Sequence, residues 1–276
     1  MRRCRPLLGT FVEIDCDLKE GFDSAFAAIE RVHRLMSAHE IDSDVSRINR
    51  FAHLRPFDVN DWTALVIERA LFWSKRSEGA FDVVRAGKAA ITSGYLPRHA
   101  DQPEPDAAHW TWLELQGGSV RLMKPACIDL GGIAKGFAVD RAVDALRAAG
   151  CERGLVNAGG DLRCFGPGPW PVSVVAPLSR LPVADIGLEN GALATSAGVP
   201  RGDGNLGFEH LGGPGGRWTS VSVLARTACD ADALTKIVWA EGLGSATVLT
   251  EVDATALLIS TNGKVETIGA EALAAA

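Results

Sequence analysis

The chain has 276 residues, which is enough for one large domain or two closely packed ones with a sizeable core. Hydrophobic residues make up 47% and charged residues 22%, as is ordinary for a soluble globular protein. The net charge of −6 argues against a nucleic-acid partner and against a polybasic, membrane-binding surface.

The N-terminus is basic, but no long apolar stretch follows before Glu13 and Asp15. We therefore expect neither a signal peptide nor a membrane span. The six cysteines are scattered and form no CxxC pair, so reduced thiols in the core are expected. Together these features predict a cytoplasmic protein.

The first third of the chain predicts one strand and two helices. Residues 10–16 alternate between apolar and polar side chains, which is typical of a half-buried strand. Apolar residues recur at helical spacing over 22–36, whereas residues 37–49 are polar and irregular. A second helix follows, capped by Asn60 or Asp61.

The middle of the chain is organised around a glycine-rich turn. After a predicted hairpin over residues 110–123, the stretch 128–140 resembles the end of a buried strand that bends through Gly131 and Gly132 into an amphipathic helix. Unpaired N–H groups at such a helix start favour an anion, most naturally a phosphate, and Lys135 adds a mobile charge. An ordinary strand-to-helix turn with a surface lysine is the alternative.

The remaining segments alternate between strands and one helix. A helix is expected over 230–239, and a closing hairpin turns at Asn262-Gly263. Strands are predicted at 154–158, 172–176, 192–196, 219–225, 255–260 and 265–268. The mixture predicts an α+β fold with a largely antiparallel sheet packed with helices. Because no segment resembles a linker, we expect a single domain over residues 1–276.

Two further segments carry polar groups that suit a site. Asn157 to Asp161 places an amide, two glycines and a carboxylate at the end of a strand, although a plain hairpin turn has the same composition. Asp232, Thr235 and Lys236 share one helix face. A carboxylate beside a hydroxyl suits a hard cation such as Mg²⁺, but the local pattern favours an ordinary surface ion pair between Asp232 and Lys236.

Histidine and serine patterns argue against a zinc site and against a serine hydrolase. His210 lies in a glycine-rich segment, where it is either a general base or simply exposed. The other histidines show no metal-ligand spacing, so a zinc site is not expected. Ser196 has no GxSxG setting, which argues against a serine hydrolase.

Taken in order, these segments resemble the ApbE family of FAD:protein FMN transferases. Asp129 to Asp140 is similar to the family's DLGGIAKGxAxD motif, and Asn157 to Asp161 is similar to its NxGGD. Shorter matches occur in the same order at Leu8-Gly9-Thr10, Leu35-Met36-Ser37, residues 43–49, Gly79-Ala80-Phe81-Asp82, Ala194-Thr195-Ser196 and Asp232-Ala233-Leu234.

The resemblance implies a T-fold-like domain with FAD as substrate and Mg²⁺ as cofactor. FMN is expected to pass from FAD to a Thr of an acceptor flavoprotein, and AMP to leave. The implied metal ligands are the Ala134 carbonyl, Asp232 and Thr235, and the implied catalytic residues are His210, as general base, and Asp232. The implied FAD-binding residues are Leu8, Met36, Asp82, Gly131, Gly132, Lys135, Asp140, Asn157, Gly159, Gly160, Asp161, Thr195 and Ser196. The backbone around Gly131 to Ala134, more than Lys135, is expected to hold the pyrophosphate.

Several positions depart from the family pattern. Lys236 stands where the family has a Thr, so either Thr235 substitutes one position early, or Lys236 reaches the phosphates or weakens metal binding. Gly213 replaces an Asp before Pro214, and Ala197 replaces a Gly. Two alternatives to the transferase therefore remain: an FAD pyrophosphatase that yields FMN and AMP, and an FAD-binding protein without turnover.

Overall fold

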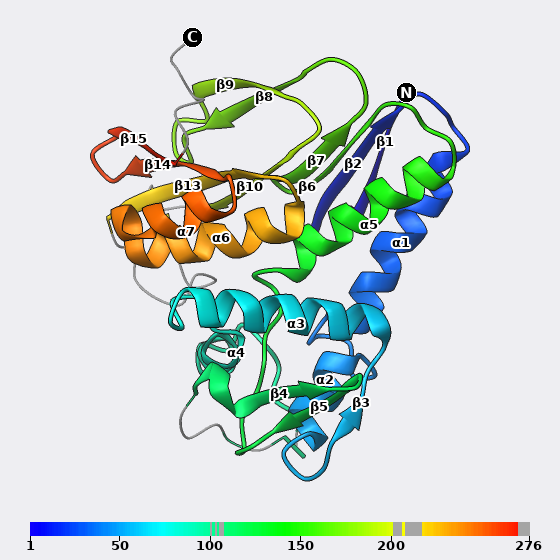
Figure 1. The fold of residues 1–276 in the computed structure, drawn as a ribbon, viewed down its shortest axis with the longest axis vertical. Helices are drawn as coiled ribbons and strands as arrows, with labels where there is room; N and C mark the ends of the chain where they lie inside the picture. The colour runs from blue at the N-terminus through cyan, green and yellow to red at the C-terminus, as the bar shows by residue number, and fades with distance from the viewer. Residues whose placement is uncertain (100, 103, 105–107, 201–205, 208–216, 270–276) are drawn as a thin grey trace. The chain divides into compact units, whose positions relative to one another are not determined.

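In the computed structural model the described residues are 1–99, 101, 102, 104, 108–200, 206, 207 and 217–269 (Figure 1). The chain divides into two compact units: unit 1 combines Met1–Glu30 with Lys135–Ala276, and unit 2 is Arg31–Ala134. The two units are defined by their internal contacts and are not shown to be separate domains. The expectation of a single domain therefore stays a prediction. None of the helices among the described residues is long and apolar enough to cross a membrane.

Unit 1 is built on an eight-stranded sheet in the order β1-β2-β6-β7-β10-β13-β14-β15. Every neighbouring pair is antiparallel. The strands are β1 (Arg2–Leu7), β2 (Thr10–Cys16), β6 (Gly154–Ala158), β7 (Asp161–Phe165), β10 (Ala192–Ala197), β13 (Trp218–Ala225), β14 (Thr255–Ser260) and β15 (Val265–Gly269). Hairpins join the strands at both edges of the sheet and at β6–β7.

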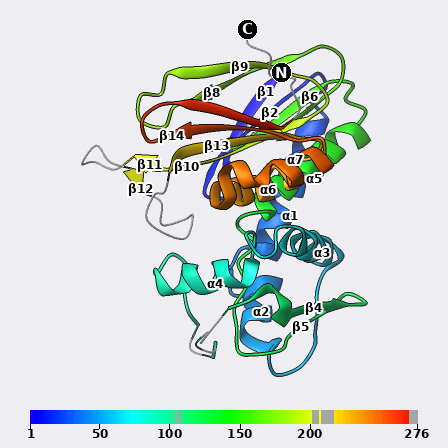
Figure 2. The same cartoon turned by 60° about the vertical axis from the view of Figure 1, so that its left-hand side comes forward.

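Helices and a two-stranded ribbon cover opposite faces of this sheet (Figure 2). Helix α6 (Ala228–Glu241) packs on β10 and β13, and α5 (Ala134–Ala148) lies on the same side. On the other face, the ribbon of β8 (Trp170–Val175) and β9 (Pro182–Leu188) encloses a core that includes Leu162, Leu193 and Leu257. Because side chains alternate along a strand, Asp161 and Arg163 point to the helix face.

Short elements complete unit 1. These are η3 (Gly242–Ser245), α7 (Ala246–Glu251), β11 (Val199–Pro200) and β12 (Leu206–Gly207). Helix α1 (Gly21–Met36) begins in unit 1 and ends in unit 2.

Unit 2 combines three helices with a small sheet in the order β3-β5-β4. Its elements are α2 (Asp44–Phe51), β3 (Phe57–Asp58), α3 (Asp61–Arg76), α4 (Val83–Thr92), η1 (Trp110–Trp112), β4 (Leu113–Gln116) and β5 (Ser119–Leu122). Its core contains the fully buried side chains of Ile48, Ile67, Trp73, Leu122 and Ile128.

The α+β prediction with a largely antiparallel sheet is confirmed, and most predicted elements lie within one or two residues of those observed. The strand at Thr10–Cys16 has the predicted bounds. Asn60 caps α3 by accepting a hydrogen bond from the Trp62 N–H. Gly242 ends α6, and Asn262-Gly263 joins β14 to β15.

Two local predictions were wrong. Residues 37–49 are not irregular throughout, because Ser43 caps α2 by accepting the Ser46 N–H, and Val45 and Ile48 become buried. The segment at Ile128 is not a strand. Instead, the Asn49 side chain pairs with both backbone groups of Ile128, at 2.7 Å and 3.0 Å. Helix α2 was missed because its sequence is mostly polar. At Ile128, the side chain of Asn49, distant in the chain, takes the place of the expected strand partner.

Candidate functional site

The starts of α5 and α6 are joined by a buried carboxylate, Asp232. Its Oδ2 accepts a hydrogen bond of 3.1 Å from the Gly136 N–H, and its Oδ1 forms an ion pair with Lys236 Nζ. Only glycine fits at position 136, since a Cβ there would lie 2.1 Å from the Ala228 carbonyl oxygen. The two helices therefore approach closely at the point where Asp232 sits.

A second buried carboxylate lies beside the first. Asp161, at the start of β7, has its Oδ2 2.7 Å from Lys135 Nζ. Burial raises the pKa of Asp161, the charge of Asp232 raises it further, and Lys135 and Lys236 act in the opposite direction. We refer to Lys135, Asp161, Asp232 and Lys236 as the Lys–Asp cluster.

The two kinds of charge in the Lys–Asp cluster differ in exposure. Asp161 and Asp232 are buried, whereas the side chains of Lys135 and Lys236 are 30% and 26% exposed. The lysine side chains are therefore the part of the cluster that solvent, or an anion in solvent, can reach. With two positive and two negative side chains, the formal charges of the cluster balance.

Asp140, one turn beyond Gly136 on α5, holds the first turn of α6. Its Oδ1 accepts the Ala228 N–H at 3.0 Å, and its Oδ2 accepts the Cys229 N–H at 2.9 Å. Arg163 Nη1 lies 2.8 Å from Oδ1. Burial raises the pKa of Asp140, and Arg163 with the two N–H donors opposes this. Asp140 is thus a clamp between α5, β7 and α6, and its predicted role toward FAD stays a prediction.

The Thr235 hydroxyl forms two hydrogen bonds within unit 1. Its hydroxyl donates to the Asp232 carbonyl oxygen at 2.7 Å and lies 2.7 Å from Ser196 Oγ on β10. Because a threonine hydroxyl has one proton, Ser196 is the donor in the second bond. Both side chains are buried between helix and sheet.

Thr195 and Ser196, whose roles toward FAD stay predictions, point to opposite faces of the sheet. Ser196 meets α6, whereas Thr195 lies on the face of Leu193 and pairs with Ser222 at 2.8 Å. Alternation along the strand would have predicted this separation from the sequence.

The predicted Asn-Gly-Gly-Asp segment forms the hairpin turn between β6 and β7. Asn157 Oδ1 accepts the Gly160 N–H at 3.0 Å. Gly159 has φ +63, and a Cβ there would lie 2.5 Å from Thr10 Oγ1. This close approach brings the β1–β2 turn, which contains Leu8, beside the turn at Gly159. Leu8 itself has φ +55, an uncommon conformation for a residue other than glycine.

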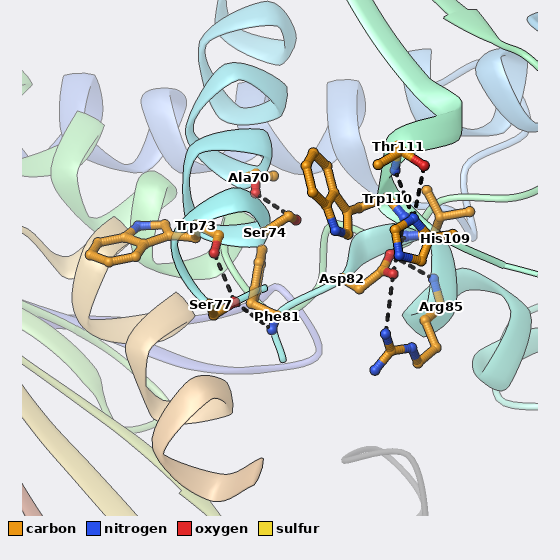
Figure 3. A network of polar contacts seen from close by, with 11 residues as sticks. Ala70, Trp73, Ser74, Ser77, Phe81, Asp82, Arg85, His109, Trp110 and Thr111 are labelled. Atoms are coloured by element: carbon orange, nitrogen blue, oxygen red, sulfur yellow. Dashed lines mark hydrogen bonds and ion pairs between the residues drawn. The ribbon is translucent and has the colours of Figure 1, made fainter. Parts of the chain in front are cut away.

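Asp82 in unit 2 caps a helix (Figure 3). Its Oδ1 accepts the N–H groups of Val84 and Arg85 at 2.9 Å and 3.0 Å, and its Oδ2 accepts the Trp110 N–H at 3.0 Å. Arg85 Nη2 lies 3.6 Å from Oδ2. These contacts give Asp82 a structural role at the start of α4, and its predicted role toward FAD stays a prediction. Met36, the last residue of α1, is buried in the core.

The backbone of the glycine-rich turn is largely paired internally, contrary to the expectation of free N–H groups. Gly131 donates to Asp129 Oδ1 at 2.8 Å. The N–H groups of Ile133 and Ala134 both donate to the Leu130 carbonyl, at 3.0 Å and 2.8 Å. The N–H groups of Gly131, Ile133 and Ala134 thus have acceptors close by in the chain, and the predicted role of this backbone toward the pyrophosphate stays a prediction. Gly132 lies in the same turn, which leads into Ala134, the first residue of α5.

His210, Gly213 and Pro214 lie outside the described residues. Sequence reasoning missed Arg163 and Gly136. Arg163 follows Asp161 by two positions and so shares its face, a signal that was available in the sequence. The need for glycine at position 136 depends on Ala228, which is distant in the chain, so no local pattern could reveal it.

The donor set around Asp232 does not fit Mg²⁺. Both oxygens of the carboxylate already have donors, and one of these is an ammonium group. Thr235 turns its hydroxyl to Ser196 and to the backbone. Among the residues that the structure describes, no group of three or more His, Cys, Asp or Glu side chains could hold a metal ion. Mg²⁺ prefers several oxygen ligands without a competing positive charge.

The sheet, its helix cover and the Lys–Asp cluster define an α+β protein with a charged site suited to an anionic ligand. The ApbE family model matches residues 8–259, and the chain belongs to the ApbE family. This match confirms the resemblance inferred from the motifs.

Similar proteins support the same family. The FAD:protein FMN transferase of Haemophilus influenzae is 28% identical over 208 residues, which cover 67% of this chain and 58% of that protein. A Vibrio cholerae protein of the same name is 29% identical over 232 residues, covering 75% and 69%. The chain thus spans less than two thirds of the Haemophilus protein.

Solved structures agree with the fold over nearly the whole chain. Flavin transferase ApbE from Vibrio cholerae superposes with a TM-score of 0.81 at 26% identity, covering 97% of this chain and 96% of that one. The ApbE protein from Thermotoga maritima superposes with a TM-score of 0.84 at 25% identity, covering 96% of both chains.

Proposed function

We propose that the protein is an FAD:protein FMN transferase. It transfers the FMN half of FAD to a Thr hydroxyl of an acceptor flavoprotein and releases AMP. The ApbE family match over residues 8–259 carries this proposal. The transferase names of the relatives support it.

The reaction is a displacement at phosphorus. The acceptor Thr oxygen attacks the phosphorus on the FMN side of the pyrophosphate, the bond from that phosphorus to the bridging oxygen breaks, and AMP leaves with that oxygen. The Thr proton passes to a base, for which His210 stays the predicted group. Such a displacement depends mainly on positioning and on stabilising charge at the phosphates.

The Lys–Asp cluster can both position the pyrophosphate and stabilise its charge. Lys135 and Lys236 present ammonium groups at the partly exposed side of the Lys–Asp cluster, where they can donate to phosphate oxygens. The buried carboxylates Asp161 and Asp232 fix the positions of those ammonium groups, and Asp140 fixes the helix that carries Asp232. Dependence on Mg²⁺, which the family resemblance implies, stays a prediction, and the donor set of Asp232 argues against it.

One incubation separates the transferase from its two alternatives. The protein is mixed with FAD, with and without a flavin-accepting protein, and the nucleotides are separated by chromatography. A transferase releases AMP only with the acceptor present. A pyrophosphatase releases FMN and AMP without it, and a binding protein leaves FAD intact.

Matched variants make the same test specific to the site. Lys135→Met removes one ammonium of the Lys–Asp cluster and should lower AMP release. Lys264→Met removes an exposed lysine that pairs with Glu266 at 3.4 Å, and it should leave the rate unchanged. AMP release that is equal in both variants would contradict a role for the cluster.

A further inference from the structure

We propose that the ammonium group of Lys236 takes the place beside Asp232 that a divalent cation would need, so that the protein supplies from its own side chains the positive charge that faces the FAD pyrophosphate. FAD binding, and the transfer that follows it, then proceed without a divalent cation. This inference rests on the proposed function and specifies how its site handles phosphate charge.

The first observation is the full set of partners on Asp232. Lys236 lies four residues further along α6, the spacing at which helical side chains meet, and its Nζ pairs with Oδ1. The Gly136 N–H donates to Oδ2. The Asp232 side chain has no exposed surface. A divalent cation bound to Oδ1 would have to displace the ammonium group or contact it directly, and like charges repel.

The second observation is the charge balance of the Lys–Asp cluster. Lys135 and Lys236 already offset Asp161 and Asp232. Without the Lys236 charge, the same four positions would carry a net negative charge and attract a cation. With it, an added divalent cation would leave an excess of positive charge around two buried carboxylates. A cluster that is balanced in this way gains little from binding a metal.

The third observation concerns the other oxygen atoms near Asp232. The hydroxyl of Thr235 donates to the Asp232 carbonyl, and it accepts from Ser196. Asp161 is paired with Lys135. A metal at Asp232 would therefore have to share each of these side chains with an existing partner.

Because the Lys236 side chain is partly exposed, it can contact a ligand while it stays paired with Asp232. The Lys236 side chain is 26% exposed, so its ammonium can keep Asp232 as one partner and offer its remaining hydrogens to an anion. Lysine is a compact point charge that binds phosphate oxygens well. The chemistry of the ligand is that of a pyrophosphate, which carries the oxygens such a group requires.

The test measures metal and FAD binding on the full chain. Mn²⁺ uptake is followed by the loss of the free-ion signal in electron paramagnetic resonance, and FAD binding by flavin fluorescence in EDTA or in Mg²⁺. The wild type should take up no stoichiometric Mn²⁺ and should bind FAD equally in both buffers. Stoichiometric Mn²⁺ uptake, or FAD affinity that falls about tenfold in EDTA, would overturn the inference.

Three variants sharpen the result. Lys236→Thr should create Mn²⁺ uptake, because Asp232 loses its ammonium partner. Lys236→Met should weaken FAD binding in EDTA by about tenfold or more, the expected loss of one charge-assisted hydrogen bond. Lys236→Arg keeps the positive charge and should take up no Mn²⁺. Lys264→Met is the matched surface control. FAD binding in EDTA that is unchanged by Lys236→Met would contradict the proposed role.

These results separate the inference from the proposed function. If FAD binds without a divalent cation but no acceptor is ever modified, the proposed function fails and the role of Lys236 stands. If the acceptor is modified only in Mg²⁺, the proposed function stands and the inference fails. If FAD binds in neither buffer, both fail.

Discussion

Asp140 offers the sharpest test of how the site is assembled. Its carboxylate accepts the N–H groups of Ala228 and Cys229 and pairs with Arg163, so one side chain joins α5, β7 and the start of α6. Asp140→Ala removes all three contacts at once. It takes the Asp140 partner away from the Arg163 side chain, which is 16% exposed, and it takes the Asp140 acceptor away from two buried N–H groups.

The expected loss is large for a single substitution. Breaking a buried ion pair typically costs about 3–5 kcal/mol, and a buried group that loses a hydrogen bond costs about 1–3 kcal/mol. Because Arg163 keeps some access to water, and because burial already disfavours the ionised Asp140, we expect the free energy of unfolding to fall by about 3 kcal/mol. Asp144→Ala, one turn later on α5, removes an exposed carboxylate paired with Arg141 and should cost about 0–1 kcal/mol.

The assay is urea unfolding followed by tryptophan fluorescence, with both variants and the wild type compared at their midpoints. The double variant Asp140→Ala with Arg163→Met should recover part of the loss, because it no longer buries an unpaired charge. If Asp140→Ala costs no more than Asp144→Ala, the carboxylate does not hold α6, and the reasoning fails.

Three further predictions use the same kind of measurement or a simple chemical probe. Gly136→Ala should destabilise the protein by about 1–3 kcal/mol, since the new Cβ would lie 2.1 Å from the Ala228 carbonyl oxygen; the usual helix gain from alanine in the same urea assay would contradict this packing. Asn49→Ala should cost about 2–4 kcal/mol, because both backbone groups of Ile128 lose their partners, and a urea midpoint close to that of the wild type would refute their burial. Of the six cysteines only Cys4 is exposed, and burial raises the pKa of Cys16 to about 11, so iodoacetamide should label one thiol per native chain; mass spectrometry showing two or more would contradict this arrangement.

Elements with strong local signals were predictable from the sequence. The Asn262-Gly263 turn and the Asn60 cap are set by neighbouring residues, so the hairpin and helix that they define matched the structure. The ion pair between Asp232 and Lys236 was also predictable, because helical spacing alone brings the two side chains together.

The burial of that ion pair could not be predicted from the sequence. Local sequence favoured an exposed pair on a helix surface, whereas Asp232 is fully buried. Its burial depends on the Gly136 N–H, almost a hundred residues earlier in the chain. The internal pairing of the Gly131 turn was missed for a related reason, because unpaired N–H groups were expected from the motif and the Asp129 side chain satisfies one of them.

The most direct test of FMN transfer is the mass of the acceptor itself. A flavin-accepting protein is incubated with FAD and this chain, and its peptides are then analysed by mass spectrometry. FMN transfer should give one FMN, linked through a phosphoester to a Thr of the acceptor, for each AMP released, and no adduct when that Thr is replaced by Val. An unmodified acceptor, in a sample where FAD is bound or is cleaved to FMN and AMP, would contradict it.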